Sequence, residues 1–418
     1  MKFVSERDTN EMLNVCGVKK IDELFIGIEP KLTRQLNLSH SMDELTLKRY
    51  MTDLSKKNNH LKCFIGGGVY DHYIPSAVNH IISRSEFYTA YTPYQAEVSQ
   101  GTLQAIYEFQ TYMCLLTGMD VANASMYDGA TALSEGAFLA CDATDRNEVA
   151  VLNKINPNYF RVLKTYCKAH GVTLTDTLSD KSACAIVQNP DYEGSVNNIN
   201  EYAELTHRFG ALLVVCITDP TSLAIIEPPG NCDADIALGD AQSFGNPISF
   251  GGPLLGFISV KKDLMKKIPG RLAGMTTDIN GKKGFVLTLQ AREQHIRRER
   301  ASSNICSNEA LCALAATVYL SFMGKKGLQN AAKLSYARAH LLQQKLCQIG
   351  FTLENNKPFY NEFTVKCPKE PGEIITALSK KGIGAGIDLG NQKMLICCTE
   401  KIREQDIDEY IDALRCIL

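Results

Sequence analysis

The stretches Ala-Cys-Ala-Ile-Val at 183–187 and Ala-Leu-Leu-Val-Val-Cys-Ile at 211–217 decide the fold class of this chain. Neither contains a charged residue, and residues 199–208 between them show a helical pattern that is followed by Gly210. A strand that is apolar along its whole length is buried on both faces, and helices between such strands are typical of parallel sheets. The sequence therefore predicts a mainly parallel sheet covered by helices on both faces.

The same alternation continues on either side of these strands. An apolar strand at 149–152 is followed by a helical stretch at 158–170. After residue 300, two long helical stretches at 307–323 and 331–349 are separated at Gly324. A smaller unit follows, with strands at 363–367 and 394–398 and helices at 372–381 and 404–418. This change of pattern predicts a compact α+β unit after the large α/β sheet.

The chain thus divides into three predicted parts. Residues 1–60 form an N-terminal helical arm, in which Ser41-Met42-Asp43-Glu44 is a capping box. Residues 61–305 form the large α/β domain. Residues 306–418 form a helical connection and the small C-terminal α+β domain.

Composition excludes several classes of protein. The 418 residues are 45% hydrophobic and 22% charged, and the formal charge is 44 − 46 = −2, so no basic field favours nucleic acid or anionic membrane. No apolar run approaches the roughly 18 residues of a membrane span. The fifteen cysteines are scattered without a CxxC pair, which indicates reduced, mostly buried thiols. We expect no metal site and a cytoplasmic location.

Residues 236–258 contain the most informative local feature. They read as an apolar strand, a small-residue loop and a second strand. In enzymes built around pyridoxal phosphate (PLP), such a unit presents the lysine that forms the Schiff base. Here the loop carries Gln242, and the next lysine is Lys261, beyond the second strand. An amide nitrogen cannot form an imine with an aldehyde, so the sequence predicts a PLP-type scaffold without its covalent anchor.

Two further segments fit such a scaffold only weakly. Gly129, Ala130 and Thr131 place backbone N–H groups at a helix start, which is either a phosphate cradle or, more often, a site of tight packing. Asp219 follows a strand at the place where these enzymes hold an acid against the pyridine nitrogen. Because Asp219-Pro220 is also a common turn and the lysine is missing, we favour the turn.

The loop from 87 to 101 is rich in groups that bind polar ligands. Tyr91, Tyr94 and Gln95 carry donors and acceptors around Pro93, just before a helix. These residues are either ligand contacts or an aromatic staple for that helix, and the sequence leaves both readings open.

An arginine cluster presents a similar choice. Arg297, Arg298 and Arg300 surround Glu299 and lie close to Asn304. They are either a solvated charged face or contacts to a phosphate or carboxylate, for which we name Arg297, Arg298 and Asn304.

Five segments together resemble one family, the P-protein of the glycine cleavage system, glycine decarboxylase. The resemblance covers most of the chain and indicates the alpha subunit (subunit 1) of the forms that are split in two. It implies the aspartate-aminotransferase fold, fold type I of PLP enzymes. The segments are Gly-Gly-Gly-Val-Tyr-Asp-His-Tyr-Ile-Pro at 66–75, Tyr-Thr-Pro-Tyr-Gln-Ala-Glu at 91–97, Asn-Ala-Ser-Met-Tyr-Asp-Gly-Ala-Thr at 123–131, Gly-Asp-Ala-Gln-Ser-Phe-Gly-Asn-Pro at 239–247 and the stretch 289–306.

The resemblance accounts for the missing lysine. The family's beta subunit carries a His-Lys-Thr-Phe run whose lysine holds PLP, where this chain has Ala-Gln-Ser-Phe at 241–244. The beta subunit also stacks a histidine on the cofactor ring, where this chain has Thr131. The resemblance therefore implies no covalent PLP on this chain and PLP on the partner beta subunit. The vestigial site would comprise Gly129, Thr131, Asp219 and Gln242.

The implied activity is that of glycine dehydrogenase (aminomethyl-transferring), with this chain inactive alone. Together the two subunits would decarboxylate glycine and pass the aminomethyl group to the lipoyl arm of H-protein. Dimers of this fold build their sites at the interface, so we expect the loop to complete the partner's site. The residues named for this are Tyr91, Tyr94, Gln95, Glu97 and Gln100. The alternatives are a catalytically silent structural or regulatory partner and a lone aminotransferase-like enzyme.

Overall fold

The structure, a computed structural model, describes residues 6–25, 27 and 37–418. It divides into two compact units, the residues up to Asn59 and His60–Leu418. The first unit contains α1 (Glu6–Val15), the 3-10 helix η1 (Ile21–Leu24) and α2 (Glu44–Ser55). The helical character expected of this arm is therefore present in its described residues.

The predicted capping box at 41–44 is wrong. Asp43 is the N-cap of α2, and its carboxylate accepts hydrogen bonds from Thr46 N at 3.0 Å and Thr46 Oγ1 at 2.6 Å. Glu44, which the box would have paired with Ser41, is already the first residue of the helix. An aspartate at the N-cap satisfies the free N–H of the first turn by itself.

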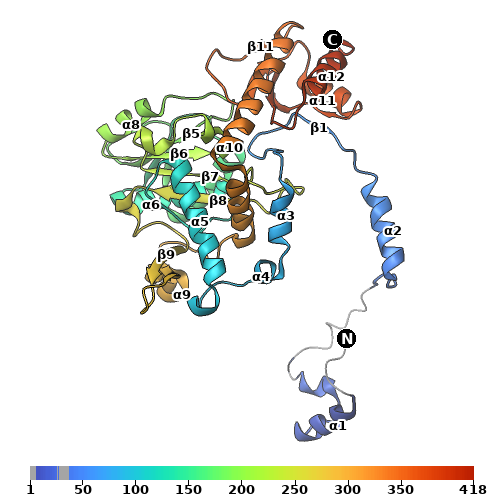
Figure 1. Ribbon diagram of the computed structural model, residues 1–418, viewed down its shortest axis with the longest axis vertical. Helices are drawn as coiled ribbons and strands as arrows, with labels where there is room; N and C mark the ends of the chain where they lie inside the picture. The colour runs from blue at the N-terminus through green and yellow to red at the C-terminus, as the bar shows by residue number, and fades with distance from the viewer. Residues whose placement is uncertain (1–5, 26, 28–36) are drawn as a thin grey trace. The chain divides into compact units, whose positions relative to one another are not determined.

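A seven-stranded sheet lies at the centre of the second unit (Figure 1). From β4 through β3, β5 and β6 to β7 all neighbours are parallel. Only β8, which pairs with β7, and β2, which pairs with β8, are antiparallel to their neighbours. The prediction of a mainly parallel sheet is confirmed. In spatial order the strands are β2 (Val121–Ala122), β8 (Gly256–Val260), β7 (Ile236–Asp240), β6 (Leu212–Ile217), β5 (Ser182–Gln188), β3 (Glu148–Val151) and β4 (Thr173–Thr175).

Helices cover both faces of this sheet. On one face, Phe109 of α5 (Gln100–Thr117) and Tyr319 of α10 (Ala310–Cys347) belong to the same buried cluster as Val215 of β6. Helix α8 (Ile199–Arg208) joins them there. The opposite face is covered by α6 (Gly129–Thr144) and α7 (Pro157–His170). Apolar strands buried on both sides are the reason that the sheet could be recognised from sequence.

Glycines end or bend the long helices where a left-handed backbone is needed. Gly118 and Gly171 cap α5 and α7 with φ of 70° and 68°. Gly324, with φ 58° and ψ −178°, kinks the 38-residue α10, which agrees with the predicted break between two helical stretches. Among the described residues, none of the helices combines the length and apolar character needed to cross a bilayer.

The C-terminal part has its own four-stranded sheet and buried cluster. The strand–helix–strand–helix order predicted for 363–418 is confirmed, while the boundary at 305 and 306 stays a prediction. Strand β1 (Lys62–Cys63) pairs in parallel with β13 (Ile383–Gly384), so the start of the second unit is tied to this end. The elements are β11 (Thr352–Leu353), β12 (Glu362–Lys366), α11 (Pro371–Ser379), β14 (Ile387–Gly390), β15 (Lys393–Cys397) and α12 (Glu404–Arg415).

A hairpin of β9 (Leu272–Thr277) and β10 (Lys283–Thr288) was not predicted. Two glutamines of α5 hold it, because each side-chain amide pairs with a strand backbone as a neighbouring strand would. Gln110 accepts from Ala273 N at 2.8 Å and donates to Ala273 O at 3.0 Å. Gln100 makes the same pair with Phe285, at 2.8 Å in both directions. The amide of Gln100 is therefore engaged within the chain.

Candidate functional site

Gln242 lies in the loop between β7 and β8, where the sequence predicted it. Its side chain is buried and both ends of its amide are bonded. Oε1 accepts from Tyr70 N at 3.1 Å, and Nε2 donates to Asn246 O at 2.6 Å. The side chain therefore fixes two backbone segments and presents no amine.

The N-terminus of α6 is filled by carboxylates of the chain itself. Asp128 caps the helix by accepting from Thr131 N at 2.7 Å, and Asp240 at the end of β7 accepts from Gly129 N at 3.0 Å. Burial raises the pKa of Asp240 to about 7. A Cβ placed on Gly129 would lie 2.3 Å from the hydroxyl of Tyr159, so this phenol packs directly against the helix start. The predicted cradle thus has internal acids where a phosphate would sit.

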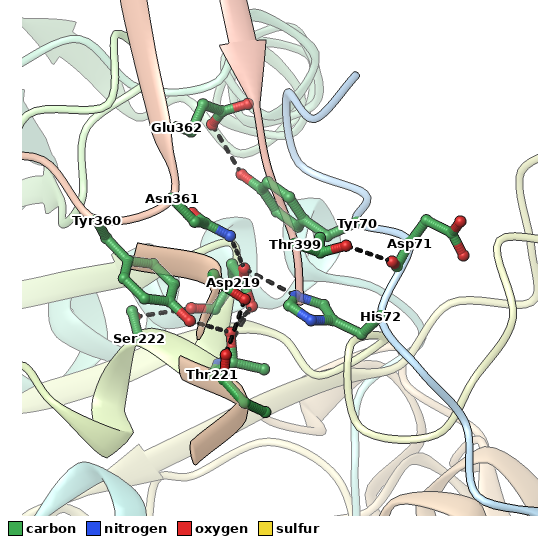
Figure 2. Close-up of polar contacts among 12 residues, drawn as sticks. Tyr70, Asp71, His72, Asp219, Thr221, Ser222, Tyr360, Asn361, Glu362 and Thr399 are labelled. Atoms are coloured by element: carbon green, nitrogen blue, oxygen red, sulfur yellow. Dashed lines mark hydrogen bonds and ion pairs between the residues drawn. The ribbon is translucent and has the colours of Figure 1, made fainter. Parts of the chain in front are cut away.

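Asp219 lies at the end of β6 and is likewise engaged (Figure 2). One oxygen accepts from Thr221 N at 3.2 Å, which caps a short 3-10 helix as the turn reading predicts, and also from Thr221 Oγ1 at 2.6 Å. The other oxygen lies 2.8 Å from Asn361 Nδ2 and 3.1 Å from His72 Nε2.

His72 places a cation against this acid. Its second ring nitrogen, Nδ1, lies 2.6 Å from Glu400 Oε2, so the buried ring is held between two carboxylates. Burial alone would lower the pKa of His72, but Asp219 and Glu400 outweigh it and raise that pKa to about 10. The carboxylate that the less favoured alternative placed against a pyridine nitrogen is thus paired with an imidazolium.

Tyr70 and Glu362, which begins β12 of the C-terminal sheet, lie beside Asp219 and are bonded to each other (Figure 2). Glu362 accepts from the Tyr70 hydroxyl at 3.0 Å and from Gly67 N at 2.6 Å. Burial raises the pKa of Glu362 to about 7. Residues 66–73 therefore run between β6 and β12 and fill the space with their own side chains.

These contacts test whether the residues present fit PLP. The site has a bonded amide in place of an amine, carboxylates at the helix start in place of free N–H groups, and a histidine on Asp219. A phosphate placed at this helix start would have to displace Asp240 from Gly129 N and would meet the Asp128 carboxylate. The residues present do not fit PLP.

Residues 87–101, which we call the tyrosine loop, lie on the surface. They comprise the end of α4 (Ser85–Tyr88), the 3-10 helix η3 (Ala96–Val98) and the start of α5. Tyr91 is 83% exposed and Tyr94 52% exposed. In the part of the chain that the structure describes, no side-chain hydrogen bond reaches Tyr91, Gln95 or Glu97. The structure thus brings these three predicted residues together on one exposed loop, and directs Gln100 to the hairpin.

Tyr94 lies over a buried arginine that the sequence analysis missed. Arg271 Nη2 donates to the Tyr94 hydroxyl at 3.2 Å, and the guanidinium carbon lies 5.4 Å from the Tyr94 ring centre. Glu293 is 3.3 Å from Arg271 Nε. No motif marks Arg271 in the sequence, because its partners come from three separate segments.

The predicted arginine contacts do not converge on one site. Arg297 Nε donates to Ala291 O at 3.0 Å, whereas Arg298 is exposed, with φ 54°. Asn304 lines a surface cavity of about 610 Å³ together with Arg300 and Glu135. His72, Asp240 and Glu400 were also missed, since nothing in the sequence shows which segments lie beside them.

Comparison with known proteins agrees across the whole chain. The family model described as "Glycine cleavage system P-protein" matches residues 3–414. The probable glycine dehydrogenase (decarboxylating) subunit 1 of Chlorobium phaeobacteroides is 48% identical over 441 residues, which cover 99% of each protein. A crystal structure of glycine decarboxylase (P-protein) of the glycine cleavage system, in inhibitor-bound form, is 39% identical with a TM-score of 0.94 and covers 100% of both chains.

More distant structures share the fold alone. Glutamate decarboxylase of Lactobacillus brevis is 10% identical, with a TM-score of 0.67 over 93% of this chain and 96% of that one. The expected fold type I architecture is confirmed. With a family model that matches nearly the full length and a relative at 48% identity, the chain belongs to the glycine cleavage system P-protein family.

Proposed function

We propose that this chain is the first subunit of a two-subunit glycine decarboxylase, in which it binds no PLP and completes the active site of a second subunit that does. The name of the relative from Chlorobium phaeobacteroides, subunit 1, supports the first part of the proposal. The misfit between the site and PLP supports the second.

The single observation that carries the proposal is the set of internal side chains in the cofactor-like site. Gln242 stands where the lysine amine would be. Asp240 accepts the hydrogen bond of Gly129 N, and His72 lies against the carboxylate of Asp219. Three independent positions would have to change before this chain could hold the cofactor. A missing lysine alone would leave a site that still binds PLP non-covalently.

The tyrosine loop supports a contribution to a neighbouring site. Tyr91, Gln95 and Glu97 expose polar tips that have no partner within the described chain. Pro93, which is buried, restricts the backbone between them. Donors and acceptors held in this way stabilise charge that develops in a site they border. Bound to the second subunit, PLP would supply the electron sink for decarboxylation.

The remaining partners follow from the proposed activity. Glycine is the substrate, and the lipoyl arm of H-protein takes the aminomethyl group. Fifteen free cysteines, most of them buried, support work in a reducing compartment such as the cytoplasm.

Reconstitution from separate subunits tests the proposal. We expect neither subunit alone to catalyse glycine–bicarbonate exchange in the presence of PLP and H-protein, and their mixture to catalyse it. Lys261→Gln, which removes the next lysine after the β7–β8 loop, is the control and should leave the mixture active. Exchange by this chain alone would overturn the proposal and favour a lone PLP enzyme.

One observation favours a silent structural partner. The Tyr94 hydroxyl is already bonded within the chain, to Arg271. If the tyrosine loop served only to support α5, substitutions in it would change stability and leave turnover untouched.

A further inference from the structure

Arg271 connects the tyrosine loop to the body of the protein. Its guanidinium donates to Tyr94 Oη at 3.2 Å and to Thr92 Oγ1 at 3.4 Å, and its side chain is buried. The same group donates to Ser307 Oγ at 3.1 Å, just before α10. We propose that Arg271 is the positioning residue that holds the tyrosine loop in the conformation that binds the second subunit. This inference rests on the proposed function.

The loop has few other polar connections. The backbone hydrogen bonds of residues 87–95 are all local, such as Ala90 N to Phe87 O at 3.1 Å and Tyr94 N to Thr92 O at 2.8 Å. Among the hydrogen bonds of the described residues, only the two from Arg271 join residues 87–95 to a distant segment. Their loss would leave residues 87–95 without a hydrogen bond to a distant segment, while Gln100 would still join the end of the tyrosine loop to β10.

Packing beneath the loop is incomplete, although Pro93 is buried. A cavity of about 180 Å³ lies between the loop and the helices α5 and α10. Tyr88, Tyr91 and Thr92 line it on the loop side, and Ala105 and Leu311 line it on the helix side. A loop with space beneath it depends on its few directional contacts for a single conformation.

The backbone of Arg271 is hydrogen-bonded to a residue next to the central sheet. Arg271 O accepts from Ala124 N at 2.8 Å, next to β2. Glu293 balances the charge, but Arg271 Nε and Glu293 Oε1 are buried without a hydrogen-bond partner, so that pair is poorly aligned. The directed bonds of the guanidinium go to hydroxyl groups, two of them in the loop.

Replacing Arg271 by lysine separates the effect of its positive charge from the effect of its hydrogen-bond geometry. Arg271→Lys keeps a cation beside Glu293 but loses the planar fork that reaches several acceptors at once. Arg146→Lys is the matched control, because Arg146 also uses one guanidinium to bind distant carbonyl groups, Ser182 O and Phe209 O, both at 2.9 Å. Neither acceptor belongs to the tyrosine loop.

Hydrogen exchange and steady-state kinetics on the two-subunit complex test the proposal together. For Arg271→Lys we expect amide exchange in residues 87–95 to rise about tenfold or more. We expect kcat to fall about tenfold with KM for glycine changed less than about twofold. Arg146→Lys should change neither. Thr92→Val, which removes one acceptor in the loop itself, should move both readouts in the same direction by less, and it tests the proposal if Arg271→Lys does not fold.

The outcomes separate the inference from the function it rests on. Unchanged exchange in residues 87–95 of both Arg271→Lys and Thr92→Val would overturn the anchoring role of Arg271. Faster exchange with wild-type kcat would confirm the anchor and overturn the loop's part in catalysis.

Discussion

At the scale of single residues, His72 is held between two carboxylates, with Asp219 Oδ2 at 3.1 Å and Glu400 Oε2 at 2.6 Å. Asp219 ends a strand of the large sheet, and Glu400 follows β15 of the small one. One imidazolium is therefore paired with two buried carboxylates that follow strands of separate sheets. Removing it would leave both acids charged and unpaired, or force them to take up protons.

We predict that His72→Gln lowers the unfolding free energy by about 3–5 kcal/mol, the usual range for breaking a buried ion pair. The deficit should be larger at pH 6 than at pH 8, because the pKa of His72 is raised from 6.5 to about 10, so the unfolded chain releases this proton in that interval while the folded chain keeps it. Denaturant titration of the complex at the two pH values measures it. His207→Gln is the control: this histidine also lies between two carboxylates, but its side chain is 32% exposed, so its loss should cost about 1 kcal/mol or less. Equal costs at the two histidines would contradict the prediction.

Glu362 sets a pH dependence with a definite sign. Its pKa rises from 4.5 to about 7 because the carboxyl is buried. The folded state therefore binds a proton more tightly than the unfolded state. Its contribution to stability is complete below about pH 4.5 and is lost as the pH rises through about 7.

Glu362→Gln keeps an acceptor for Gly67 N and has no proton to lose. We predict that this variant gains stability relative to the unmodified chain between pH 5 and pH 8, by on the order of 2–3 kcal/mol. Melting temperatures across that range measure the change. Glu354→Gln is the control: the bond from Lys393 lowers the pKa of Glu354 below its ordinary value of 4.5, so the effect of this substitution should not change between pH 5 and pH 8. A pH-independent difference for Glu362→Gln would refute the assignment.

At the scale of elements, the sequence predicted what local patterns determine. The apolar runs became β5 and β6, and Gly118 and Gly171 became left-handed helix caps. The β9–β10 hairpin was missed although Asn280-Gly281 is a hairpin signal between its strands. The glutamine side chains of α5 that hold it come from a distant segment.

The candidate site was predictable only in part, for the same reason. The replacement of lysine by Gln242 is visible in the loop itself. The contact of Asp240 with the start of α6 exists only because the sheet brings the end of β7 beside it. Residues such as Asp240 and Arg271 therefore need the tertiary structure to be recognised.

For the tyrosine loop, we predict that Tyr94→Phe leaves assembly intact and lowers turnover about tenfold or more, or roughly 1.4 kcal/mol of transition-state stabilisation. The substitution keeps the ring and removes only the hydroxyl that Arg271 binds. Tyr336→Phe, at a partly exposed tyrosine of α10, is the control and should leave turnover unchanged. Glycine–bicarbonate exchange and melting temperature on one preparation distinguish a catalytic loop from a helix support. Wild-type turnover in Tyr94→Phe, Tyr91→Phe and Gln95→Ala would remove the loop from the site.

At the scale of the whole molecule, the proposed function requires a stable complex of two different chains. Exposed apolar side chains, among them Tyr88, Tyr91 and Val98 of the tyrosine loop, agree with a surface that a partner covers. We predict that the two subunits co-purify and remain together in size exclusion at micromolar concentration, with an interface well above about 1,000 Å². Separation of the chains at that concentration would count against a permanent complex.

Borohydride reduction shows which chain of the two-subunit complex holds PLP. The two-subunit complex is saturated with PLP and reduced, and the intact mass of each chain is measured. We predict one phosphopyridoxyl group on the second subunit and no stoichiometric label on this chain, in which Gln242 stands where the lysine would be. A single, fully modified lysine on this chain would contradict it.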